Sequence, residues 1–121
     1  MDIASLLAVA KSSSASDLHI VAGTPPMLRV HGSMRPIGDS APLTSEDTNQ
    51  ALSQLATPGQ RSAFETRMEL DFGLTAPGVG RIRCNAARQQ GTTSLVIRLL
   101  PETIPTIEEL GLPAVCKDLA L

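Results

Sequence analysis

The chain has 121 residues, of which 42% are apolar and 18% charged, and its formal net charge is −2. These values are typical of one soluble globular domain, and they exclude a disordered chain and a protein that binds nucleic acid through a generally basic surface. The aromatic residues are Phe64 and Phe72 alone, so the stacking side chains of a single-strand nucleic-acid binder are missing as well.

No apolar run approaches the roughly 20 residues of a membrane span, and the apolar run near the N-terminus is too short for a secretory signal. We therefore expect a cytoplasmic protein without direct membrane insertion. Cys84 and Cys116 have no CxxC spacing, so reduced thiols are expected and a zinc site is not.

The N-terminal part predicts one helix and three strands. Helical spacing of apolar residues over residues 3–10 follows Asp2, a plausible N-cap. Extended segments at residues 17–23 and 27–32 flank a Thr-Pro-Pro turn, and a short strand at residues 34–37 completes a hairpin.

Two capping signals predict two further helices. Thr44 is followed three residues later by Asp47, and Thr57 is followed by a proline and then by Gln60. The second of these helices should carry Phe64 into the core.

The C-terminal half predicts an antiparallel hairpin and a last strand. Residues 68–74 alternate with an acidic outer face, residues 81–86 alternate with a basic one, and a turn separates them. In such a hairpin Asp71 and Arg83 can face each other on the same side of the sheet. The final strand, residues 94–100, should bury its leucine and isoleucine side chains on the opposite side from its arginine.

These elements predict an α+β fold, a mostly antiparallel sheet with helices packed on one face. From residue 101 onward, three prolines interrupt any long element. We therefore expect a domain over residues 1–103 and a connector over residues 104–121.

Four of the eight arginines lie between residues 80 and 101. Arg83 and Arg98 each sit in the middle of a strand among apolar neighbours, where the planar guanidinium suits bidentate contact with phosphate or carboxylate. A solvated strand face or cross-strand ion pairs would account for Arg81 and Arg88.

The chain contains no Walker A phosphate loop, nucleophile elbow or zinc-protease motif, so it lacks a catalytic apparatus of its own. Asp17 and His19 share one face of a strand, but no third ligand is evident, and polar strand positions are the simpler interpretation. We expect neither catalytic nor metal-binding residues within this chain.

Four ordered segments resemble the N-terminal domain of the PilT-type retraction ATPases of type IV pili. Wider relatives are the type II and type IV secretion ATPases and the pilus extension ATPases. The segments are SASDLHIVAGTPPMLRVHGSMRPI (residues 14–37), ELDFGL (69–74), GRIRCNAARQQGTTSLVIRLLP (80–101) and IPTIEELGLP (104–113).

The resemblance implies a PAS-like α/β sandwich followed by a RecA-like ATPase domain, which would begin where this chain stops. The absence of a longer N-terminal extension favours the retraction branch. The resemblance further implies a homohexameric motor at the inner-membrane platform protein, powered by ATP with Mg²⁺ bound mainly on the RecA-like domains of the same and neighbouring subunits. Arg83 and Arg98 match the two family arginines that reach the nucleotide phosphates, and Arg81 and Arg88 are weaker candidates.

An alternative interpretation is a free-standing PAS-like sensor or adaptor that binds a small anionic ligand or a protein partner. A phosphate loop encoded shortly after Leu121 would favour the motor, and a stop codon would favour the sensor.

Overall fold

The computed structural model describes residues 2–89 and 91–100. The predicted connector, the predicted domain boundary at residues 103 and 104, and Cys116 lie outside the described residues.

The N-terminal helix and strands form where the sequence predicts them. Helix α1 (Ile3–Ser12) begins after Asp2, whose side chain accepts a hydrogen bond from the backbone N–H of Ala4 at 3.1 Å. Strands β1 (Asp17–Val21), β2 (Met27–Val30) and β3 (Ser33–Pro36) follow and pair in sequence order as antiparallel neighbours.

Both predicted capping boxes are present and start the next two helices. Helix α2 (Ser45–Leu55) begins after Thr44, and helix α3 (Pro58–Arg67) begins after Thr57. In each box the threonine side chain accepts the backbone N–H three residues on, and that residue's side chain accepts the threonine N–H.

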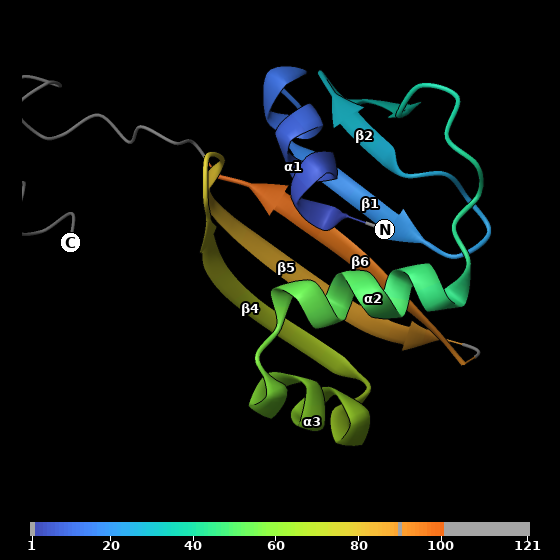
Figure 1. Cartoon of the computed structure of the whole chain (residues 1–121), viewed down its shortest axis with the longest axis vertical. Helices are drawn as coiled ribbons and strands as arrows, with labels where there is room; N and C mark the ends of the chain where they lie inside the picture. Colours follow the sequence, from blue (N-terminus) through green and yellow to red (C-terminus); the bar gives the residue numbers. More distant parts are fainter. Residues whose placement is uncertain (1, 90, 101–121) are drawn as a thin grey trace, which may run out of the picture.

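Strands β4 (Glu69–Ala76), β5 (Gly80–Gln89) and β6 (Thr92–Leu99) complete one six-stranded sheet of order β3-β2-β1-β6-β5-β4, shown in Figure 1. The paired neighbours are all antiparallel. Strand β1 lies between β2 and β6, so this long-range pairing joins the N-terminal and C-terminal halves of the sheet.

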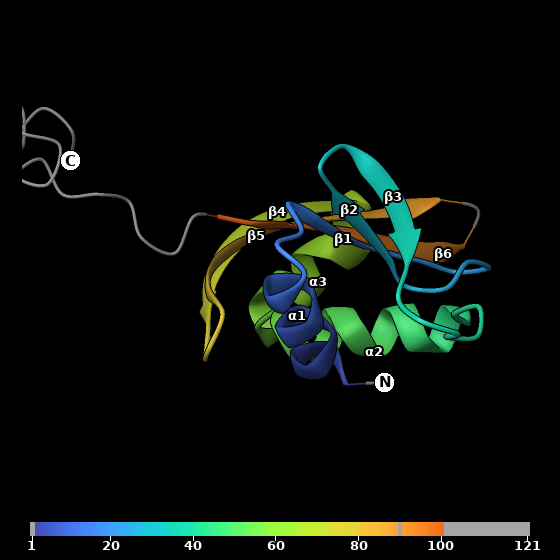
Figure 2. The same ribbon diagram turned by 90° about the horizontal axis from the view of Figure 1, so that it is seen from above.

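The helices lie along one face of the sheet, as the view along its edge shows (Figure 2). The core is this interface, where Leu18 and Ile20 of β1 and Leu95 and Ile97 of β6 are fully buried together with Phe64 of α3. The predicted α+β fold with helices on one face is therefore confirmed. No helix among the described residues is both long and apolar enough to cross a membrane.

Candidate functional site

A row of charged side chains crosses the sheet face that the helices leave uncovered. Arg98 of β6 lies directly opposite Arg83 of β5 on one side and opposite Asp17 of β1 on the other. Arg29 of β2 continues the row, because it lies opposite Asp17. Directly opposed residues of paired strands point to the same face, so these four side chains are neighbours.

Arg83 and Arg98 form a like-charged pair at the middle of this row. The Cα atoms of opposed residues lie about 4.5–5.5 Å apart in antiparallel strands, and like charges in these positions destabilise the pairing. Their side chains are 65% and 70% exposed, so water screens part of the repulsion. The sheet therefore gains no stability from placing two cations at these opposed positions.

Arg83 is held by Asp71 of β4. Its Nε and Nη2 atoms donate to the two carboxylate oxygens of Asp71 at 3.1 and 2.9 Å. These hydrogen bonds hold the pKa of Asp71 below its ordinary value and raise the pKa of Arg83. The predicted contact between Asp71 and Arg83 is therefore present, although the direct Cα partner of Asp71 is Asn85.

Among the described residues, the ion-pair partner of Arg98 is the buried carboxylate of Asp17, and this contact is longer than the one that holds Arg83. Its Nε lies 3.5 Å from Oδ1 of Asp17, whose side chain is 10% exposed. The same carboxylate accepts the hydroxyl of Ser16 at 2.8 Å and lies 3.7 Å from Nε of Arg29. Asp17 is thus the counter-ion for two arginines, and the Arg98 side chain is 70% exposed.

A hollow of about 170 Å³ lies beside the two arginines. Its lining is formed by Asp71, Arg83, Asn85, Val96 and Arg98. Val96 and Asn85 are directly opposed residues of β6 and β5 and lie next in register to the arginine pair. The hollow therefore brings two guanidinium groups, an amide and the Asp71 carboxylate together on an exposed surface.

Arg81 lies on the same face as Arg83 but nearer the end of β5. It is opposite Thr75, and its Nη1 lies 3.4 Å from the Thr75 hydroxyl. The direct partner of Arg83 is Gly73, which has no side chain. The guanidinium of Arg81 lies over this position, because a Cβ on Gly73 would be 3.4 Å from Nη2 of Arg81. Arg81 is therefore a neighbour of the Arg83–Arg98 pair without lining the same hollow.

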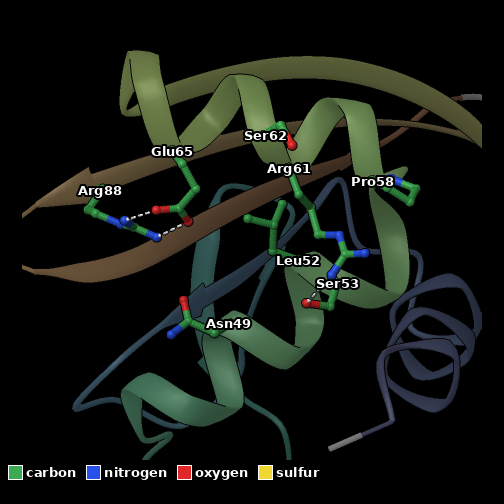
Figure 3. Close-up of a pocket in the computed structure, with 8 residues that line it drawn as sticks. All are labelled: Asn49, Leu52, Ser53, Pro58, Arg61, Ser62, Glu65 and Arg88. Atoms are coloured by element: carbon green, nitrogen blue, oxygen red, sulfur yellow. Dashed lines mark hydrogen bonds and ion pairs between the residues drawn. The ribbon is translucent and has the colours of Figure 1, made fainter.

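Arg88 lies on the opposite, helix-covered face, as Figure 3 shows. Its Nη1 and Nη2 donate to Glu65 of α3 at 2.7 and 2.8 Å, and its guanidinium lies 5.0 Å from the centre of the Phe64 ring. The ion pair lowers the pKa of Glu65. Arg88 is 23% exposed, so it is a packed residue of the helix–sheet interface and differs from the expected surface charge.

Arg88 and Glu65 also line a larger hollow, of about 440 Å³, between α2, α3 and β5 (Figure 3). Arg61 of α3 reaches across it, and its Nη1 lies 3.4 Å from the hydroxyl of Ser53 in α2. The two hollows are on opposite faces of the sheet, so Arg88 lies on the other face from the pair of Arg83 and Arg98.

Asp17 and His19 have no third metal ligand beside them among the described residues. Asp17 is occupied by arginines, and Nε2 of His19 is buried without a hydrogen-bond partner among the described residues. Within residues 2–89 and 91–100 there is no group of three or more His, Cys, Asp or Glu side chains that could hold a metal ion.

The contact between Asp17 and Arg98 was not predicted from the sequence. The pairing of β1 with β6 brings Asp17 beside Arg98, which is 81 residues away along the chain, and no local pattern indicates that pairing. The face on which Arg88 lies could have been predicted. Side chains alternate between the two faces of a strand, so in a strand that extends to Gln89 residue 88 points to the opposite face from Arg83.

Comparisons with known proteins find that the chain is similar to part of several ATPases. A scan against protein-family models found no match. The chain is 41% identical over 117 residues to the type IV pilus retractation ATPase PilT of Pseudomonas aeruginosa, which covers 97% of the chain and 34% of that protein. It is 36% identical over 121 residues to the type IV pilus ATPase PilU of the same organism, covering all of the chain and 31% of PilU.

Solved structures agree with the sequence matches. The pilus retraction motor PilT with bound ADP superposes with a TM-score of 0.82 at 34% identity, covering 96% of this chain and 34% of that one. The ATPase DotB of Legionella pneumophila shares the fold, with a TM-score of 0.69 at 23% identity over 93% of this chain and 32% of DotB. The chain thus spans about a third of the length of the proteins it matches. Its fold and its sequence together show that the chain belongs with the N-terminal domains of the PilT-type secretion ATPases.

Proposed function

We propose that this chain is the N-terminal domain, residues 1–103 with a connector over residues 104–121, of a cytoplasmic hexameric ATPase that powers type IV pilus retraction. ATP with Mg²⁺ would be bound mainly by a RecA-like domain that follows the connector. The N-terminal domain would supply Arg83 and Arg98 to the phosphates and form part of the ring interface. The likeness to PilT over nearly the whole chain supports the assignment.

The observation that carries the proposal is the like-charged pair itself. Arg83 and Arg98 are directly opposed on an exposed face, and each lies beside a hollow that is open to solvent. Two guanidinium groups so placed can donate to different oxygens of one polyphosphate. A charge of this kind stabilises the negative charge on a phosphoryl group as it is transferred.

A mechanical cycle follows from this charge arrangement. ATP on a RecA-like domain attracts the arginine face and draws the two domains together. Hydrolysis and phosphate release remove that attraction, so the N-terminal domain returns as a rigid body. Contacts between this domain and a neighbouring subunit would pass the movement around the ring to the membrane platform protein.

The test is ATP turnover of the full-length protein carrying Arg83→Ala or Arg98→Ala. An arginine that contacts the transferred phosphoryl group contributes a factor on the order of 10³–10⁵ in GTPases, so we expect each variant to lose at least about tenfold in turnover. Arg61→Ala is the matched control, since Arg61 is an exposed arginine on the helix side of the sheet, and it should retain turnover within about twofold. Wild-type turnover in both sheet-face variants would disprove the assignment.

The alternative, a free-standing PAS-like sensor, would use the same hollow for a small anion. Identity of 41% and 36% to two ATPases over nearly the whole chain favours the motor. A phosphate loop encoded soon after Leu121 distinguishes the two directly.

A further inference from the structure

The two central arginines are each paired with an aspartate on the side away from the other arginine. In strand order, Asp17 lies on β1, Arg98 on β6, Arg83 on β5 and Asp71 on β4. Asp71 therefore attracts Arg83 toward the β4 edge, and Asp17 attracts Arg98 toward the centre of the sheet. The charge order across the face is negative, positive, positive, negative.

To hold one phosphate jointly, the two arginines must turn toward each other instead of toward their aspartates. The phosphate must lie between β5 and β6, at the hollow that both arginines line together with Asn85 and Val96. Asp71 uses the Nε and Nη2 donors of Arg83, which form one of the forked faces that a phosphate oxygen pair would use. Arg83 must therefore release Asp71, or share its remaining donors, to converge on a ligand with Arg98.

The two aspartates differ in what their release involves. Asp71 is 49% exposed, so water can solvate its carboxylate when Arg83 leaves. Asp17 is buried, but it keeps the Ser16 hydroxyl and Arg29 when Arg98 moves. Neither aspartate is left buried and unpaired, so the two-arginine site can open without a large penalty.

Resting on the function proposed above, we propose that Asp71 is a built-in carboxylate competitor that holds Arg83 away from Arg98 until a polyphosphate displaces it. Convergence of two guanidinium groups is opposed by their mutual repulsion, and a ligand with several negative charges compensates for it better than a ligand with one. The ligand class is therefore a di- or triphosphate. A monovalent anion such as acetate should leave the Asp71–Arg83 pair in place.

The test is a double-variant cycle on the 121-residue chain, with sodium tripolyphosphate as the probe and calorimetry at fixed ionic strength as the measurement. Asp71→Asn keeps the side-chain shape and removes the competing charge, and it should tighten binding by about three- to tenfold. The gain must disappear when Arg83→Ala is also present, because the competitor acts through Arg83.

Glu69→Gln is the matched control. Glu69 lies on the same strand and face as Asp71, it is exposed, and the structure gives it no ion pair among the described residues. The Glu69→Gln substitution removes one negative charge, as Asp71→Asn does, but it frees no arginine. Tripolyphosphate binding should therefore tighten by less than about twofold.

A second readout needs no ligand. The Nε–H of Arg83 should give an exchange-protected NMR signal in the wild-type chain and lose that protection in Asp71→Asn. The proposal is overturned if Asp71→Asn binds tripolyphosphate no more tightly than the wild-type chain, or does not bind it at all. It is also overturned if the gain in affinity persists when Arg83→Ala is present. These results are separate from the proposed function, which fails instead if Arg83→Ala and Arg98→Ala leave ATP turnover of the full-length protein unchanged.

Discussion

Arg83 and Arg98 are directly opposed residues of β5 and β6, with no acidic side chain between them in the pairing register. Their counter-ions come from the flanking strands β4 and β1, so four strands are needed to assemble the site. The pairing of β1 with β6 therefore supplies the carboxylate that accompanies Arg98.

Asp17 is expected to stabilise the fold much more than Asp71 does. Asp17 is buried, forms ion pairs with Arg98 and Arg29, and accepts a hydrogen bond from Ser16. Hydrogen bonds to a charged group contribute about 1.5–3 kcal/mol to stability. Asp17→Ala should lower the free energy of unfolding in urea by about that amount. Asp71→Ala, which removes an exposed pair, is the control and should have a clearly smaller effect. Equal losses would show that the burial of Asp17 is unimportant.

Phe64 is expected to be a principal core residue of the helix layer. It is fully buried on α3, and Arg88 stacks over its ring. Phe64→Ala should reduce the free energy of unfolding by about 3–5 kcal/mol, because it leaves a cavity and removes the surface under Arg88. Val9→Ala on the exposed side of α1 should change it by no more than about 0.5 kcal/mol. Urea denaturation of both variants tests this, and a similar small effect at position 64 would contradict the described core.

Met68 adopts a left-handed backbone conformation at the end of α3, with φ of 63°. A side chain in this conformation costs about 1–2 kcal/mol, whereas glycine adopts it freely. Glycine also gives the unfolded chain more conformational entropy, which offsets part of this gain. Met68→Gly should therefore raise the free energy of unfolding by a net amount of about 0.5–1 kcal/mol. Met68→Ala keeps the strain and should give no such gain. A Met68→Gly protein less stable than Met68→Ala would refute the predicted strain relief.

Cys84 is expected to make stability fall in alkaline solution. Burial among apolar residues raises the pKa of its thiol to about 12 from an ordinary value of 9.0, and the negative charge of Asp71 adds to the shift. The folded state keeps the proton that the unfolded state loses, so this contribution is complete below pH 9 and declines as pH rises toward 12. The decline should be absent in Cys84→Ala. Parallel pH profiles of unfolding free energy for the two proteins would contradict the burial argument.

The helices and hairpins were predictable because their signals are local. Thr44 and Thr57 each stand three residues before a side chain that completes a capping box, and both boxes are present. Alternation in β4 and β5 placed Asp71 and Arg83 on one face, which the ion pair between them confirms. Such features depend on residues that are near in sequence or joined by a short turn.

The site as a whole could not be predicted because it depends on which strands become neighbours. The residue types of Arg83 and Arg98 suggested a role in anion binding, but their direct opposition follows from the β5–β6 register. The role of Asp17 follows from the β1–β6 pairing, which joins the two halves of the chain. The sequence predicts the same surface role for Arg81 and Arg88, whereas the longer β5 strand places the two side chains on opposite faces.

The most direct test of the central claim is a structure of the full-length protein with a non-hydrolysable ATP analogue. We expect the guanidinium groups of Arg83 and Arg98 both to lie within about 2.7–3.2 Å of phosphate oxygens, the range of direct hydrogen bonds. The opposite result is a structure in which other residues enclose the bound nucleotide. In that structure Arg83 and Arg98 would still pair with Asp71 and Asp17, on a face turned away from the phosphates. Such a structure would contradict the claim that the two arginines contact the nucleotide.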